Sequence, residues 1–163
     1  MKTRMEKSQW SPPGNYSLPT RTIRTFLAED SPLLMALLAR IVLKDKRVFI
    51  VGSATDGRKA VCNAPTLQPD LVITDLHMPG LDGAEAARRL KHLPNPPIIF
   101  VVTGDDTPEA WARSMAAGAD AFLVKAGNLV PRLLSAIQEF FPDELDSNEA
   151  APKHLRETLT TVA

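Results

Sequence analysis

Short apolar segments alternate with longer helical segments through most of the chain, and this alternation constrains the fold more than any other feature. Five segments rich in Val, Ile and Phe are short enough to be strands: residues 22–29, 47–54, 71–75, 97–103 and 121–125. Helical patterns or start signals occupy the intervals: residues 32–43, the segment after Asp56, and residues 83–93, 108–117 and 129–141. Such alternation favours a parallel sheet with right-handed crossovers and helices on both faces. The middle three apolar segments are continuously apolar, as strands covered on both faces must be.

Local signals predict where the helices begin and end. Ser31 and Thr107 each precede a proline that suits a first helical position, and Asp82 with Glu85 three residues later resembles a capping box. Pro65 is expected to end the second helix early, because proline lacks the backbone donor that a helix needs.

Length and local composition predict one domain with two extensions. A chain of 163 residues suits a single domain. Residues 1–20 lack a hydrophobic period and mix Ser, Pro, Gly and Asn, so we expect a flexible arm. The domain is expected over residues 21–141, and residues 142–163 are expected to form a disordered or partly helical tail.

The overall charge excludes some classes of partner. Nineteen basic and nineteen acidic residues give no net charge, which argues against an electrostatically driven binder of nucleic acid or of a membrane surface. The single cysteine, Cys62, excludes an internal disulfide, and no apolar run approaches the ~18 residues of a membrane span. The cytoplasm is the simplest compartment for such a chain.

Charged and polar side chains lie at the ends of four of the five expected strands. The first strand ends in Glu29 and Asp30, the third in Asp75, the fourth in Thr103 and the fifth in Lys125. Each residue alone has an ordinary explanation, such as a helix cap or a solvated charge. Because parallel strands end at one edge of the sheet, however, the three carboxylates would repel one another unless a cation lay among them. A hard divalent ion with oxygen ligands, Mg²⁺ above all, is expected there.

One segment makes the pattern more specific. LVITDLHMPGLDG (71–83), together with the strand-end residues above and GADAFLVK (118–125), resembles the receiver domain of two-component response regulators over residues 21–141. The resemblance implies a doubly wound, flavodoxin-like α/β fold whose five-stranded parallel sheet has the order 2-1-3-4-5, with helices on both faces. It also implies a domain that is not itself an enzyme for other molecules and that receives a phosphoryl group from a sensor histidine kinase.

The resemblance assigns roles to the strand-end residues. Asp75 would be the phosphoacceptor. Asp30, Asp75 and the backbone carbonyl of His77 would ligate Mg²⁺ directly, and Glu29 would act mainly through a bound water. Lys125 would pair with the phosphoryl group, and Thr103 would hydrogen-bond to it.

It also implies how the signal leaves the site. Thr103 would move toward the phosphoryl group while Phe122 rotates inward, which changes the surface of the fourth helix, fifth strand and fifth helix. Trp111 in the fourth helix is a candidate contact for a partner. His77 and Asp105 are expected to face each other across the site, where they would impede an attacking water and so tune the lifetime of the acyl phosphate.

Ala126 departs from the family pattern, which usually has a proline after the lysine with a cis peptide bond. A cis bond before alanine costs about 2.5 to 4 kcal/mol, so the placement of Lys125 and the isomer of this bond stay open.

Several functions are compatible with the sequence. The first is a stand-alone receiver that switches partner binding, because only 22 residues follow position 141, too few for a separate DNA-binding domain. Alternatives are a relay that passes phosphate to a histidine phosphotransfer protein, or a receiver-like adaptor that ignores phosphorylation. A phosphohydrolase of the aspartyl-phosphate type usually has a second acid where this chain has His77. The resemblance also allows a phosphorylation-dependent homodimer.

Overall fold

The computed structural model describes residues 21–143. The elements follow one another as β1 (Ile23–Ala28), α1 (Pro32–Val42), β2 (Val48–Ala54), α2 (Gly57–Leu67), β3 (Leu71–Thr74), α3 (Gly83–Lys91), β4 (Ile98–Thr103), α4 (Pro108–Ala116), β5 (Ala121–Val124) and α5 (Leu129–Phe140). The strands pair in parallel in the order β2-β1-β3-β4-β5. The predicted fold class and strand order are therefore confirmed. The expected arm (1–20) and all but the first two residues of the expected tail (142–163) lie outside the described residues.

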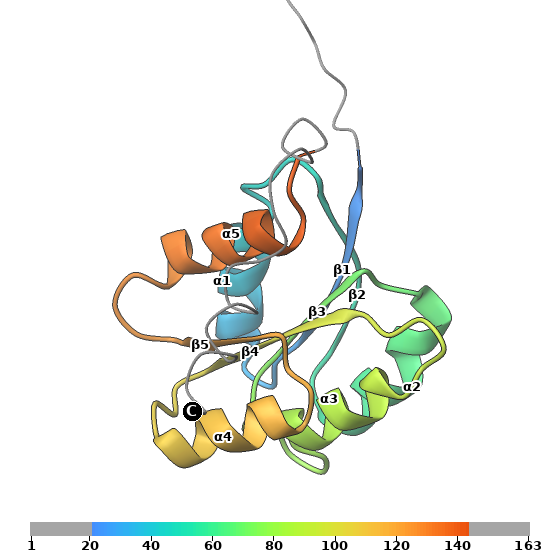
Figure 1. Cartoon of the computed structure of the whole chain (residues 1–163), viewed down its shortest axis with the longest axis vertical. Coiled ribbons are helices and arrows are strands. Elements are labelled where there is room, and N and C mark those ends of the chain that lie inside the picture. The colour runs from blue at the N-terminus through green and yellow to red at the C-terminus, as the bar shows by residue number, and fades with distance from the viewer. Residues whose placement is uncertain (1–20, 144–163) are drawn as a thin grey trace, which may run out of the picture.

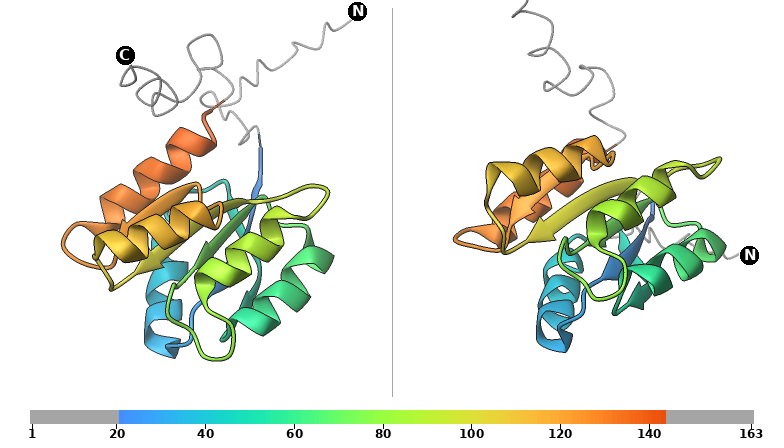
Figure 2. Two further views of the ribbon diagram at one scale, coloured as in Figure 1. Left: turned by 60° about the horizontal axis from the view of Figure 1, so that its bottom comes forward. Right: turned by 90° about the horizontal axis from the view of Figure 1, so that it is seen from below.

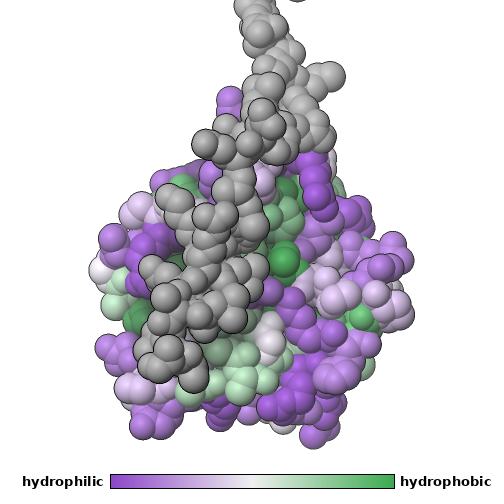
Figure 3. Space-filling model, viewed as in Figure 1, coloured by the Kyte–Doolittle hydropathy of each residue, from purple (hydrophilic) through white to green (hydrophobic). Residues whose placement is uncertain are grey.

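Helices cover both faces of the sheet. Helices α1 and α5 lie together on one face, and α2, α3 and α4 lie on the other (Figures 1 and 2). Each face has its own core, one built around Phe26, Val72 and Val101 and the other around Leu27, Ile73 and Phe100. Neighbouring residues of each central strand thus point to opposite faces, which is why β3 and β4 are apolar without interruption. Outside these cores, hydrophilic residues make up most of the described surface on the side shown in Figure 3.

The predicted helix starts are capped as the sequence indicates. Side-chain oxygens of Ser31, Asp56, Asp82 and Thr107 each accept a hydrogen bond from the backbone N–H three residues later. Each cap satisfies one of the backbone donors that a helix leaves free in its first turn, so local chemistry fixes where the chain turns from each loop into its helix.

Two local expectations were wrong. Pro65 does not shorten α2, which continues to Leu67 and ends at Gln68 in the left-handed region (φ 46°). Proline's fixed φ suits a helix, and its position in the last turn removes only one backbone donor. The second wrong expectation was that residues 47–54 would form a strand covered on both faces. Strand β2 instead lies at the edge of the sheet, and its Phe49 is 60% exposed. Continuous apolar character does not distinguish an edge strand from a central one.

The open question about Lys125 and Ala126 has a clear answer. No cis peptide bond occurs within residues 21–143, so the Lys125–Ala126 bond is trans. The backbone N–H of Lys125 donates to the carbonyl of Thr103 at 2.7 Å, which continues the β4–β5 pairing to this residue. Lys125 is thus positioned by the sheet itself.

Candidate functional site

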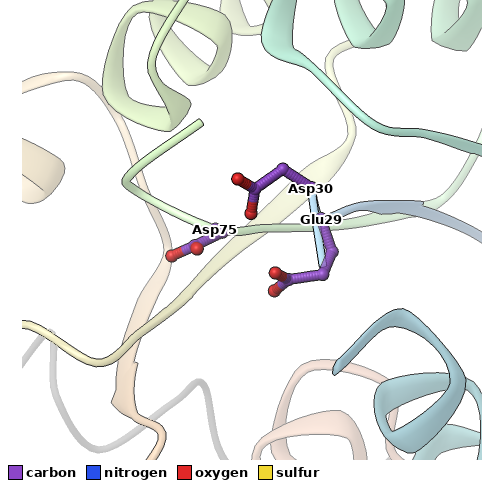
Figure 4. Close-up of side chains that lie close together, drawn as sticks. All are labelled: Glu29, Asp30 and Asp75. Carbon is purple, nitrogen blue, oxygen red and sulfur yellow. The ribbon is translucent and has the colours of Figure 1, made fainter. Parts of the chain in front are cut away.

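Three carboxylates meet at the carboxyl edge of the sheet. Glu29 and Asp30 follow β1, and Asp75 follows β3, the strand beside it. Their side chains point toward one another, and one oxygen from each lies within 4.8 Å of the others (Figure 4). The backbone N–H of Asp75 donates to the carbonyl of Ala28 at 2.9 Å, so strand pairing extends to the site and fixes the two chain segments side by side.

The two oxygens of the Asp75 carboxylate have different surroundings. Asp75 is only 7% exposed, and its Oδ2 lies 3.0 Å from the Lys125 ammonium. Its Oδ1 is buried and has no hydrogen-bond partner among the described residues. Buried carboxylate oxygens are ordinarily hydrogen-bonded, so this oxygen has the environment of an atom that binds a further group.

Both oxygens of Glu29 already have partners. Oε1 accepts a hydrogen bond from the backbone N–H of Ser31 at 3.2 Å, and Oε2 accepts one from Lys125 Nζ at 2.6 Å. Burial raises the pKa of Glu29, and the hydrogen bond from Lys125 opposes this rise. Lys125 therefore connects Glu29 to Asp75, and its charge balances part of the charge of the acidic cluster.

The donor set fits a hard divalent cation. Asp75 Oδ1 has no partner within residues 21–143, and the exposed Asp30 lies beside it, so these two carboxylates can approach a Mg²⁺ ion directly. Glu29 is held through both of its oxygens, which is compatible with the contact through water that the resemblance implies for it. Three carboxylates face one lysine here, so a cation would relieve the remaining repulsion.

Close packing at the start of α3 holds the Asp75 backbone in place. A Cβ atom on Gly83 would lie 1.9 Å from the carbonyl oxygen of Asp75, far closer than a side chain allows. Gly83 N–H also donates to the Leu76 carbonyl at 2.9 Å. Gly83 was not among the predicted site residues, although it follows the Asp82 cap and ends the segment 71–83 that resembles receiver domains.

A polar pair lies at the rim of the site. His77 Nε2 and Asp105 Oδ2 are 3.0 Å apart, so the expected pair does face each other. The hydroxyl and backbone N–H of Thr107 both donate to Asp105 Oδ1, and together with His77 these contacts lower the pKa of Asp105 to about 2. Thr107 was predicted only as a helix cap, and its contact with Asp105 could not be predicted from local sequence.

The two expected switch residues, Thr103 and Phe122, and the expected partner contact, Trp111, are increasingly exposed to solvent in that order. Thr103 is fully buried, and its Oγ1 accepts a hydrogen bond from the Asp105 backbone N–H at 3.2 Å. Phe122 is half-buried and packs against the core beneath α2, α3 and α4. Trp111 is 54% exposed on α4, and Met115, one turn later, is 36% exposed. Thr103 is thus near the site, whereas Trp111 is available at the surface.

Comparison with known families agrees with this geometry. Residues 25–138 match the family described as the response regulator receiver domain. The chain belongs to this family. Receiver domains serve two-component systems and generally bind Mg²⁺ at an acidic pocket, which corresponds here to the cluster of Glu29, Asp30 and Asp75.

Relatives of the chain differ in their full length. A protein-glutamate methylesterase/protein-glutamine glutaminase of Myxococcus xanthus is 32% identical over 142 residues, which cover 86% of this chain and 36% of that protein. The transcriptional regulatory protein PdtaR of Mycobacterium tuberculosis is 36% identical over 141 residues, which cover 85% of this chain and 67% of PdtaR. This receiver chain thus spans about a third of the length of the methylesterase relatives and two thirds of PdtaR.

A solved structure shows the same fold. The response regulator domain of Thermotoga maritima CheB superposes with a TM-score of 0.66 at 27% identity, over 72% of this chain and 95% of that domain. Within residues 21–143, this receiver chain has no helix of sufficient length and apolar character to cross a membrane.

Proposed function

We propose that this receiver accepts a phosphoryl group on Asp75 from a phosphohistidine of a sensor histidine kinase, in a reaction that requires Mg²⁺. The observation that carries the proposal is the state of the Asp75 carboxylate. One oxygen is paired with Lys125, and the other is buried beside Asp30 and has no partner in the part of the chain that the structure describes.

The chain's residues would supply most of what the transfer needs. An oxygen of Asp75 forms the new bond to phosphorus while the bond from phosphorus to the histidine nitrogen breaks, and that nitrogen keeps the electron pair. Mg²⁺, held by Asp30, Asp75 and the carbonyl of His77, would stabilise the negative charge of the phosphoryl oxygens. Lys125, already within 3.0 Å of Asp75, would pair with those oxygens and would remain tied to the sheet through its backbone.

The start of α1 offers a surface for the phosphodonor protein. This helix begins two residues after Asp30, and Leu33 and Leu37 on it are 79% and 45% exposed. Residues four apart lie on the same face of a helix, so the two leucines form an apolar pair beside the site. We assign this pair to docking of the kinase domain that carries the phosphohistidine.

The output would leave the site through Thr103 and Phe122. A phosphoryl group on Asp75 would draw the Thr103 hydroxyl toward it and let Phe122 pack further inward, which changes the α4-β5-α5 face. Trp111 and Met115 are exposed on that face and would contact the downstream target. The same face is the candidate surface for a phosphorylation-dependent homodimer. We place this exchange in the cytoplasm, between soluble protein partners and without direct binding to nucleic acid.

Phosphorylation by a small donor tests the central claim. The full chain is incubated with Mg²⁺ and acetyl phosphate and analysed by intact mass. We expect one phosphoryl group on the parent and on Asp106→Asn, a matched change of an exposed neighbouring aspartate, and none on Asp75→Asn. An unmodified parent, or equal modification of Asp75→Asn, would show that Asp75 is not the acceptor.

Two further measurements separate the remaining functions. Transfer of the label from Asp75 to a histidine phosphotransfer protein would identify a relay, whereas partner binding that survives Asp75→Asn would identify an adaptor. The rim pair is tested by replacing both His77 and Asp105 with alanine. We expect faster loss of phosphate from Asp75, because their side chains lie where water would approach; an unchanged half-life would contradict that role.

A further inference from the structure

The start of α2 packs directly against the loop that follows Asp75. A Cβ atom on Gly57, the first residue of α2, would lie 2.0 Å from the carbonyl oxygen of Leu81 and 2.8 Å from its carbonyl carbon. Both atoms belong to the backbone, so rotation of a side chain could not relieve the collision. Gly57 is buried, and its φ is not in the left-handed region. The close approach of two backbones, and not an unusual conformation, is therefore what requires a glycine here.

The loop between β3 and α3 is held unevenly by the core. Leu76 and Met78, on either side of His77, are buried, so the first part of the loop is anchored by its own side chains. Residues 79–82 are exposed or half-buried, and Gly80 among them has a φ of 80°. The contact with α2 therefore supports the part of the loop that its own side chains hold least.

The segment leading into α2 also contacts the other half of the acidic cluster. The carbonyl of Ala54, the last residue of β2, accepts a hydrogen bond from the backbone N–H of Glu29 at 3.0 Å. Gly57 follows three residues later. Residues 54–57 thus connect the segment that carries Glu29 to the loop that carries His77, although none of them belongs to the acidic cluster.

We propose that Gly57 is a positioning residue for the Mg²⁺ site. Its missing side chain lets α2 pack against the Leu81 carbonyl, which keeps the loop where the His77 carbonyl can join Asp30 and Asp75 as a ligand. This inference rests on the proposed function, because the ligand role of His77 belongs to it. Gly57→Ala would displace the loop from α2 and so withdraw one ligand, while both carboxylates stay attached to their strands.

Calorimetric titration of the full chain with Mg²⁺ tests the proposal. We expect Gly57→Ala to raise the Kd for Mg²⁺ about tenfold, the effect typical of residues that hold metal ligands in place. The matched control is Gly52→Ala on β2, whose Cβ would lie 2.6 Å from Leu67 Cδ1. This control should also lower Tm but should leave the Kd unchanged, because Leu67 lies at the opposite end of α2 from Gly57.

Two further measurements separate positioning from a general loss of stability. In the metal-free chain, the backbone N–H groups of Leu81 and Gly83, which both donate within the loop, should exchange faster in Gly57→Ala than in Gly52→Ala. With acetyl phosphate, Gly57→Ala should need about tenfold more Mg²⁺ for half-maximal phosphorylation. At saturating Mg²⁺ its rate should approach that of the parent, because the acceptor carboxylate is unchanged.

A second variant keeps the proposal testable if Gly57→Ala does not fold. Leu81→Gly loosens the same contact from the loop side without adding an atom, and it should weaken Mg²⁺ binding, whereas Leu43→Gly at the exposed end of α1 should not. Unchanged Mg²⁺ affinity in Gly57→Ala, or in Leu81→Gly where the first variant is unfolded, would overturn the proposal. Equal weakening by Gly52→Ala would do the same. A parent chain that binds no Mg²⁺ would instead overturn the proposed function, and this inference with it.

Discussion

Replacing Arg47 with methionine should lower the free energy of unfolding by about 3 kcal/mol. Arg47 lies in the turn before β2, yet its guanidinium holds the end of α5. It donates to the carbonyl of Phe141 at 2.5 Å, to the Gln138 side chain at 2.8 Å and to Asp143 at 2.9 Å. Two further hydrogen bonds bind both oxygens of Asp45, at 3.1 and 2.7 Å.

The size of the effect follows from which of these partners water can reach. The Asp143 side chain is 53% exposed and can be rehydrated, so its loss contributes little. The Phe141 carbonyl and the Asp45 carboxylate, whose side chain is 15% exposed, would lose their donor in a buried setting. Removing one partner from a buried ion pair costs about 3 to 5 kcal/mol, and we take the lower end because Asp45 keeps some access to water.

Urea unfolding followed by circular dichroism measures the change. For a domain of this size about 3 kcal/mol corresponds to a fall in Tm of roughly 6 to 12 °C, which leaves the domain folded at room temperature. Arg47→Lys should lie between the parent and Arg47→Met, because an ammonium keeps the charge but cannot bridge several acceptors. Arg132→Met, an exposed change on α5, should remain within about 0.5 kcal/mol of the parent.

The pH dependence provides an independent check. The hydrogen bonds from Arg47 lower the pKa of Asp45 below 3.8 in the folded chain. A lowered carboxyl pKa stabilises the fold above the unfolded pKa, and that stabilisation is lost as the pH falls through the folded pKa. The difference between the parent and Arg47→Met should therefore shrink in acid. A loss of less than about 1 kcal/mol at neutral pH, the ordinary effect of a surface change, would refute this account of Arg47.

Three other predictions concern the site. Glu29→Gln should weaken Mg²⁺ binding by about 10- to 100-fold, as expected for a residue that acts through water, and Asp30→Asn should weaken it more; calorimetry that gave the reverse order would contradict the assigned roles. Gly83→Ala should destabilise the domain by about 1 to 3 kcal/mol because its Cβ would collide with the Asp75 carbonyl, whereas Gly104→Ala, with nothing within 4 Å, should be tolerated. The Asp105 carboxyl should titrate near pH 2 in an NMR experiment, since donors from two loops stabilise its ionised form, and a midpoint near 3.8 would show that those contacts do not form in solution.

Local chemistry made much of the fold predictable. Strand and helix positions depend on the period of apolar residues and on caps such as Ser31 and Thr107, and these signals lie within a few neighbouring residues. The candidate site was predictable for a related reason. Parallel strands all end at one edge, so residues that follow strands, such as Glu29, Asp75 and Lys125, must converge there.

Other features depend on contacts between distant segments and could not be predicted from local patterns. Strand β2 is as apolar as its neighbours, and only its place at the edge of the sheet exposes Phe49. In the sequence, Arg47 is indistinguishable from an ordinary exposed charge in a turn. Only the fold places the end of α5 against it, where it donates to Phe141 and Gln138. The exposed face of Trp111 likewise depends on how α4 packs on the sheet.

The order of elements, the sheet and the set of residues at its carboxyl edge follow from the amino-acid sequence, because apolar periodicity, helix capping and parallel strand pairing depend on local residue patterns. The hydrogen-bond and ion-pair partners of those residues, by contrast, depend on the packing of distant segments. The Lys125 ammonium contacts both Glu29 and Asp75, and the backbone N–H of Ser31 donates a hydrogen bond to the second oxygen of Glu29. Among the described residues, one oxygen of Asp75 is consequently left buried and without a partner. Hydrogen-bond partners are allocated by the packing of segments far apart in the chain, and that allocation gives Asp75 the free oxygen its proposed chemistry needs.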